Sequence, residues 1–79
     1  MTWNYRVVKD KDGYWIREVY YDNSGVPRSC TENPSAPYGE DEHELVRDIA
    51  LMIRGTRLPV LNFEDFEDLE ENPESSIDN

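Results

Sequence analysis

Side chains alternate in character along residues 2–10, which read TWNYRVVKD. Trp3, Tyr5 and Val7 fall on one side of an extended chain, as expected for a β-strand with one buried face. A second segment of the same kind, YWIREVYYD at residues 14–22, follows the turn sequence KDKDG. The glycine of that turn can take the positive φ angle that tight turns need. The two segments therefore predict an antiparallel β-hairpin.

A third and weaker strand is predicted at VPRSCTENP, after the turn DNSG. Pro27 has no amide proton to donate to a neighbouring strand, so this strand should lie at an edge of the sheet. Farther along, apolar side chains recur at helical spacing between Asp41, which can cap a helix, and Gly55, which can end one. This apolar stripe consists of Leu45, Ile49, Met52 and Ile53. We expect the stripe to seal the helix onto the sheet.

These elements predict an α+β fold in which a three-stranded antiparallel meander packs against one α-helix, in the order β-β-β-α. The segment RLPVLNF after the helix should be extended, because Pro59 disfavours helical geometry at the residue before it. It can add a short fourth strand. A small α+β domain is therefore expected over residues 1–61, followed at residues 62–79 by an acidic C-terminal segment that is partly disordered.

The net charge of the chain is −10, and most of it lies near the C-terminal end. Residues 62–79, NFEDFEDLEENPESSIDN, contain eight acidic residues and no basic one. This charge argues against direct binding to nucleic-acid phosphates or anionic membranes, and favours a basic protein partner. A solvating tail is the simplest interpretation. However, Phe63 and Phe66 are interleaved with the acids, which favours an ordered acidic element over residues 62–71.

No catalytic, metal-binding or cofactor-binding signature is present in the sequence. His43 lacks a second metal ligand of the HExxH kind one turn away. Cys30 and His43 could act as a nucleophilic pair only with an oxyanion loop and an orienting residue, which the sequence does not show. A single cysteine excludes an intramolecular disulfide, and no apolar run approaches the ~20 residues of a membrane span. We therefore predict a cytoplasmic protein that is not an enzyme and needs no cofactor.

Two resemblances bear on the fold. The order β-β-β-α is similar to that of the HicB-type antitoxin domain. The stretches WNYRVV, EVYYD, TENP, GE and PVL, spread over residues 3–61, resemble a family of short bacterial proteins of unknown function. Because that family has no assigned activity, the resemblance transfers no functional residue.

The main functional hypothesis is a non-catalytic module of antitoxin or inhibitor type. It would bind a basic protein partner through an aromatic face of the sheet and through the acidic end. The predicted partner-binding residues are Trp15, Arg17, Tyr21, Phe63, Glu64, Asp65, Phe66, Glu67 and Asp68. Two alternatives stay open: a phage-type inhibitor that mimics nucleic acid, as some anti-CRISPR proteins do, and a single-stranded nucleic-acid binder whose sheet is masked by its own tail.

Overall fold

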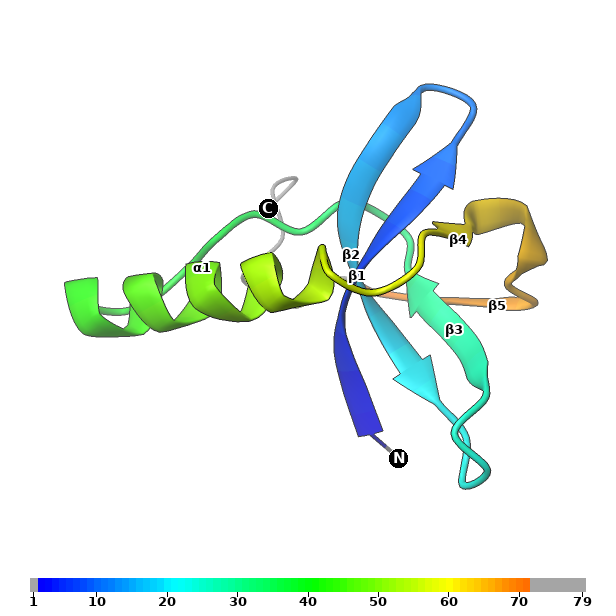
Figure 1. Ribbon diagram of the computed structural model, residues 1–79, viewed down its shortest axis with the longest axis horizontal. Coiled ribbons are helices and arrows are strands. Elements are labelled where there is room, and N and C mark those ends of the chain that lie inside the picture. The colour runs from blue at the N-terminus through cyan, green and yellow to red at the C-terminus, as the bar shows by residue number, and fades with distance from the viewer. Residues whose placement is uncertain (1, 72–79) are drawn as a thin grey trace.

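The computed structural model describes residues 2–71 and shows an α+β architecture, with a five-stranded mixed sheet and one α-helix (Figure 1). The strands are β1 Thr2–Asp10, β2 Gly13–Tyr21, β3 Pro27–Thr31, β4 Leu61–Asn62 and β5 Asp68–Glu70. In the sheet they follow the order β4-β1-β2-β3-β5. The helix α1 spans Glu42–Gly55, and a three-residue 3-10 helix, η1, spans Phe63–Asp65.

The predicted antiparallel meander is confirmed. β1 and β2 pair over their whole length, from Thr2 opposite Tyr21 to Asp10 opposite Gly13. β3 pairs antiparallel with β2, with Cys30 opposite Val19. The expected fourth strand is also present, because β4 pairs in parallel with β1 beside Val8 and Lys9. The alternating pattern and the turn chemistry therefore determine the central three strands.

The C-terminal segment adds strands to both edges of this sheet. Asn62 belongs to β4, and β5 pairs in parallel with β3 at the opposite edge. The sequence pattern ends the domain at residue 61, whereas the structure places residues 68–70 in the sheet. Residues 72–79, for which disorder is expected, lie outside the described residues.

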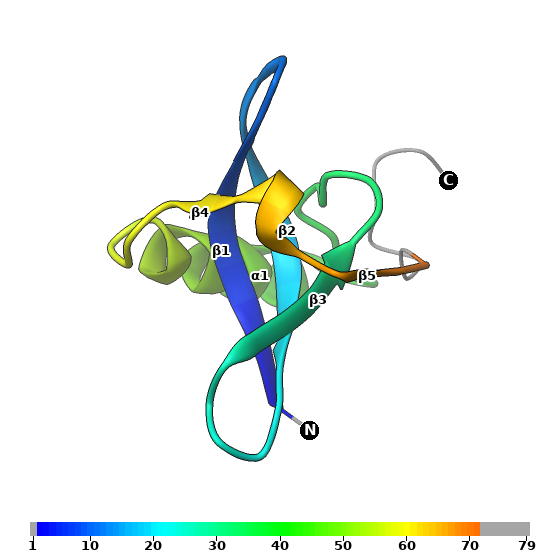
Figure 2. The same cartoon turned by 90° about the vertical axis from the view of Figure 1, so that its right-hand side faces the viewer.

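Linking two opposite edges through so short a connection forces the sheet to curl. A flat five-stranded sheet would hold its outer strands about 19 Å apart. The link from Asn62 to Asp68 takes six residue steps, which would span about 20–22 Å if fully extended. Three of its residues are coiled as η1 and rise only about 2 Å each, which shortens the link to about 16 Å. The sheet is therefore a half-barrel, and the link crosses its open side in front of β1 and β2 (Figure 2).

The best-buried apolar cluster lies inside this half-barrel. Val8, Val19 and Cys30 are fully buried there, and four partly buried side chains pack against them. Those four are Tyr21, Leu61, Phe63 and Phe66. Figure 2 shows β4, η1 and β5 on one side of the sheet and α1 behind it on the other. The sheet thus builds its main core with the C-terminal segment, and the helix covers the opposite face.

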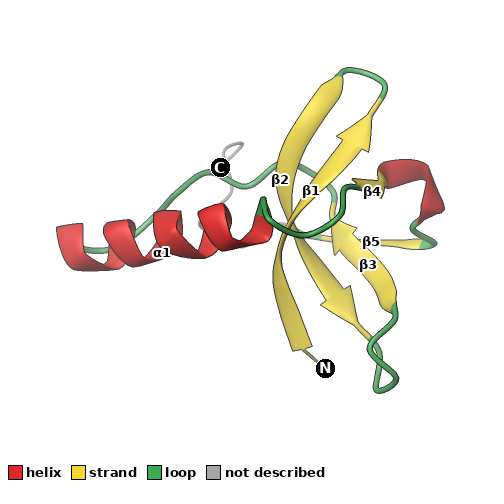
Figure 3. Cartoon of the chain, viewed as in Figure 1, coloured by secondary structure: helices red, strands yellow, loops and turns green. Residues whose placement is uncertain are grey.

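The helix forms as expected but does not bury the expected stripe. Asp41 caps it, since its carboxylate accepts a hydrogen bond of 2.9 Å from the Glu44 amide. Met52 of the stripe is buried, but Ile49 is 39% exposed and Ile53 52% exposed, so the prediction that the whole stripe seals α1 onto the sheet is wrong. Of the residues of α1, Met52 and Gly55 are buried. The helix packs mainly on β1 and extends beyond the sheet (Figure 3).

A polar contact explains how α1 is turned. The Tyr5 hydroxyl donates a hydrogen bond of 2.6 Å to the Asp48 carboxylate. Asp48, Met52 and Gly55 recur at i, i+4 and i+7, so the side of the helix that carries this contact faces β1. The isoleucines lie on a flank of the helix instead. No helix within residues 2–71 is long and apolar enough to cross a membrane.

Candidate functional site

The turn after β4 sorts its side chains into an inner and an outer set. In a 3-10 helix the residues i and i+3 lie on the same side. Phe63 and Phe66 have this spacing, and the Phe66 amide donates to the Phe63 carbonyl at 3.2 Å. Both rings pack against the core. The side chains between and after them are exposed, and we call them the acidic ridge: Glu64, Asp65, Glu67 and Asp68.

The two phenylalanines therefore have a different surrounding from the one predicted. The sequence predicts them as contacts with a partner, but the structure packs them against the chain's own core. The physical reason is the curl of the sheet, which leaves an apolar interior that only this segment covers. Their rings fix the backbone that carries the acidic ridge. They thereby position its carboxylates.

Arg17 is also placed differently from the prediction. It is 4% exposed, so a surface contact with a partner is excluded for its side chain. The guanidinium lies 4.5 Å from the centre of the Phe63 ring and 3.4 Å from the Asp10 carboxylate. Arg6, its neighbour across β1 and β2, is buried as well. The inner face of the half-barrel thus holds two cations under the C-terminal segment.

The other two predicted residues of the sheet differ in accessibility. Tyr21 is half-buried against the core, and its hydroxyl donates to Asn4 at 2.7 Å while accepting from Arg6 at 2.8 Å. Trp15 remains exposed near the hairpin turn. Its indole N–H donates to Asp10 at 3.3 Å. Trp15 and the acidic ridge are therefore the predicted residues that a partner can reach.

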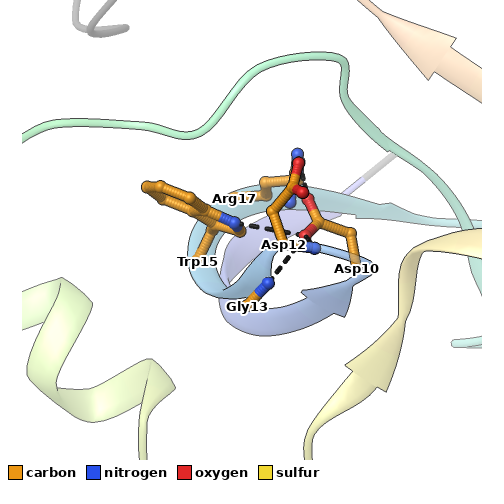
Figure 4. A network of polar contacts seen from close by, with 5 residues as sticks. All are labelled: Asp10, Asp12, Gly13, Trp15 and Arg17. Atoms are coloured by element: carbon orange, nitrogen blue, oxygen red, sulfur yellow. Dashed lines mark hydrogen bonds and ion pairs between the residues drawn. The ribbon is translucent and has the colours of Figure 1, made fainter.

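The Asp10 carboxylate holds the hairpin turn together (Figure 4). One oxygen accepts hydrogen bonds from the amides of Asp12 at 2.8 Å and Gly13 at 3.1 Å. Burial acts to raise the pKa of Asp10, but these two amides and the neighbouring Arg17 outweigh it, so that the pKa lies below its usual value. Gly13 takes a φ of 146°, which few other residues adopt. The end of the hairpin is therefore a fixed structure, with Asp10 ionised at neutral pH.

A hollow of about 510 Å³ lies between this hairpin end and η1. Its lining residues are Lys9, Asp10, Lys11, Asp12, Asn62, Phe63 and Glu64. The Phe63 ring gives it an aromatic surface, and Asp12 and Glu64 bring exposed carboxylates to it from segments about fifty residues apart in the sequence. The sequence shows KDKDG only as a turn, and nothing in its pattern indicates that this turn faces residues 62–64.

Neither candidate for catalysis has the surroundings that catalysis needs. Cys30 is fully buried in β3, and burial raises the pKa of its thiol to about 11, although the nearby Arg17 acts to lower it. A buried thiol with a raised pKa is a poor nucleophile at neutral pH. His43 lies exposed in the first turn of α1. No group of three potential metal ligands occurs within residues 2–71.

The arginines that would serve a nucleic-acid-binding sheet are engaged elsewhere. Arg6 and Arg17 are buried, and Arg28 pairs with Asp22 at 2.8 Å. Base-stacking sheets need exposed cations beside their rings to hold phosphates. The placement of these three side chains therefore weighs against the single-strand alternative.

A buried carboxylate on the helix-side face gives a testable pH dependence. Glu18 is nearly fully buried, and this burial raises its pKa, although a hydrogen bond of 2.7 Å from the Tyr20 hydroxyl opposes the shift. When folding raises the pKa of a carboxyl group, the folded protein loses stability as the pH rises through that pKa, because the group must then carry its charge while buried. We therefore expect Glu18→Gln to raise the melting temperature at pH 7. The gain should shrink as the pH falls through the raised pKa of Glu18, and it should be absent below the ordinary pKa of glutamate.

Thermal melts at pH 7 and at pH 4 measure this effect. Glu32→Gln is the matched control, because Glu32 is exposed and the substitution removes the same charge. If both variants melt alike at pH 7, the Glu18 carboxylate is solvated in solution.

No protein-family model, no curated protein and no solved structure matches this chain. The resemblances to the HicB-type antitoxin domain and to the family of short bacterial proteins therefore stay hypotheses.

Proposed function

We propose that this protein is a non-catalytic module of inhibitor or antitoxin type that binds a basic protein partner across the acidic ridge and the adjoining hollow. One observation carries the proposal. Phe63 and Phe66 pack into the half-barrel and hold Glu64, Asp65, Glu67 and Asp68 on the outside of an ordered turn. Exposed carboxylates on an ordered backbone lose less entropy on binding than carboxylates on a flexible tail.

The chemistry of the hollow suggests how a basic side chain would be bound. A lysine or arginine entering it would pair with the carboxylates of Asp12 and Glu64, in competition with Lys9 and Lys11, which also line the hollow. The Phe63 ring contributes apolar surface, since its cation contact is already made with Arg17. Trp15, exposed near the same hairpin end, offers a further aromatic surface. The net charge of −10 would speed the approach of a basic partner. The buried, unpaired Cys30 fits the cytoplasm, where we place the protein.

The proposal can be tested without knowing the natural partner. A randomised peptide-display selection on the immobilised protein should enrich lysine- and arginine-rich sequences. The selected peptides should lose affinity for the triple variant Glu64→Gln/Asp65→Asn/Glu67→Gln by about tenfold at low salt, since each exposed ion pair contributes roughly 0.5 kcal/mol. The loss should be smaller at high salt, because salt screens exposed charges.

The control variant is Glu32→Gln/Glu40→Gln/Glu42→Gln, which removes three exposed charges elsewhere on the surface. Its affinity should stay close to that of the unmodified protein. If both triple variants weaken binding equally, net charge alone accounts for it and the ridge is no specific site. Competition by DNA for a natural basic partner would favour the nucleic-acid mimic over an inhibitor that binds elsewhere on its target.

A further inference from the structure

The first residues of β1 form an open sheet edge. On one side β2 pairs with β1 over its full length, but on the other side β4 reaches only Val8 and Lys9. In the part of the chain that the structure describes, no strand pairs with Thr2–Asn4 on that side. The segment after α1 passes close to β1 above this stretch, where the Arg6 guanidinium donates to the Pro59 carbonyl at 2.7 Å. An exposed edge presents unpaired N–H and C=O groups on which another strand can add.

A groove of about 370 Å³ lies beside this edge, between β1 and the end of α1. Its walls are Trp3, Asn4 and Tyr5 on the strand, and Leu51, Arg54, Gly55 and Leu58 on the helix and the following turn. Trp3 is 46% exposed although its ring packs edge-to-face on Tyr5 at 5.2 Å. Side chains directly across from each other in paired strands share a face of the sheet. A strand added beside Trp3 would therefore direct alternate side chains into this groove.

The charge in the groove indicates what a bound segment must carry. Among the described residues that line it, Arg54 alone is charged. Within residues 2–71 the guanidinium of Arg54 has no hydrogen-bond or ion-pair partner. The last carbonyls of α1 are capped by the Thr56 amide, which reduces their repulsion of an anion. A free guanidinium beside an apolar groove fits a carboxylate next to an apolar side chain.

We propose that this edge binds an extended segment of another protein by strand addition. An apolar side chain of that segment would enter the groove between Trp3 and Leu58, and a carboxylate would pair with Arg54. Main-chain hydrogen bonds to Thr2–Asn4 would supply affinity, while the groove and Arg54 would supply selectivity. The carboxylate belongs to an aspartate or glutamate side chain of that segment. This site is separate from the acidic ridge and needs no basic partner.

Fluorescence polarisation with labelled peptides tests the proposal on the full chain. Three five-residue peptides alternate threonine with leucine: one ends in an aspartate with an amidated terminus, one ends in a free carboxyl group, and one is neutral throughout. The aspartate peptide should bind about tenfold more tightly than the neutral one. Tighter binding of the free-carboxyl peptide than of the aspartate peptide would mean that the site takes a chain terminus instead, against the proposal. Methylating alternate backbone nitrogens should abolish binding, since it removes the donors to the edge.

Matched variants of the protein separate the site from general charge effects. Arg54→Gln should weaken the carboxylate peptide about tenfold, whereas Arg57→Gln, an exposed arginine outside the groove lining, should leave it unchanged. Leu58→Asp should also weaken it. The triple variant of the acidic ridge should not, which keeps this test independent of the function proposed above.

Three further results would overturn the inference. One is failure of the aspartate peptide to bind at millimolar concentration. Another is equal binding of the N-methylated peptide. The third is a dimer in sedimentation that Leu58→Asp dissolves, which would mean that a second copy of this chain occupies the edge.

Discussion

Replacing Phe63 with alanine should lower the free energy of unfolding by about 3 kcal/mol, the low end for removing a buried aromatic side chain, because the ring is only partly buried. The ring covers the cluster of Val8, Val19 and Cys30 and lies over the guanidinium of Arg17. Its removal opens the half-barrel and leaves a buried cation without its aromatic cover. A domain of this size has a total stability of only about 5–15 kcal/mol, so the loss should be visible in urea or thermal denaturation.

The matched control for this variant is Ile49→Ala. A helical stripe normally marks the core, and by pattern alone Ile49 would be the more damaging position. In the structure its side chain is 39% exposed, so we expect the substitution to cost less than about 1 kcal/mol. If instead Ile49→Ala destabilises more than Phe63→Ala, the helix and not the C-terminal segment seals the core. Phe63→Leu adds a further comparison, since it keeps apolar cover and loses only the cation–ring contact.

The contrast between these two positions shows where prediction from the sequence succeeds. The hairpin follows from local chemistry. Side chains alternate in β1 and β2, and the turn between them is closed by a hydrogen bond from the Gly13 amide to the Asp10 carboxylate. The helix cap at Asp41 is local in the same sense. Such features depend on residues within a few positions of each other, and a sequence displays them directly.

The rest depends on contacts between distant segments. Which side of α1 faces the sheet is set by the hydrogen bond from Tyr5 to Asp48, residues 43 positions apart. A rule based on apolar spacing places Met52 inside correctly, but it also places the polar Asp48 outside and Ile49 inside, whereas Ile49 is exposed. Likewise, β5 is too short and too acidic to indicate a strand, and it forms because β3 offers it an edge.

The candidate site likewise combines residues that the sequence alone could identify with features that depend on contacts between distant segments. The acids of the ridge and the exposed Trp15 could be selected from composition and spacing. Arg17 could not be recognised as buried, because its cover comes from Phe63, which is 46 positions away in the sequence. The hollow joins residues 9–12 to residues 62–64, and the open edge of β1 arises because β4 is only two residues long. Both are properties of the assembled fold.

Gly55→Ala should destabilise the protein, against the usual trend for helices. Alanine in place of glycine inside a helix normally stabilises by up to about 1 kcal/mol. Here a Cβ on residue 55 would collide with the Tyr5 carbonyl oxygen and lie 2.8 Å from its carbonyl carbon. These are backbone atoms of a paired strand, so they cannot move aside as the end of a side chain can.

The helix would have to move away from β1 instead. That movement would stretch the 2.6 Å hydrogen bond between Tyr5 and Asp48 and expose Met52, which is among the few buried residues of α1. Forcing extra volume into a packed contact costs about 1–3 kcal/mol, which exceeds the gain in helix propensity. We therefore expect a net loss of about 1–2 kcal/mol in chemical denaturation.

Ala50→Gly measures the effect of helix propensity alone, because residue 50 is exposed in the same helix. This variant should lose about 1 kcal/mol of unfolding free energy. A gain of that size for Gly55→Ala would mean that α1 does not touch β1 closely at this point.

Gly55→Ala also bears on the open edge of β1, since Gly55 lines the groove beside Trp3. A displaced helix end would carry Arg54 away from β1. Gly55→Ala should therefore weaken the carboxylate peptide under conditions where the protein is still folded, whereas Ala50→Gly, equally destabilised, should bind it normally.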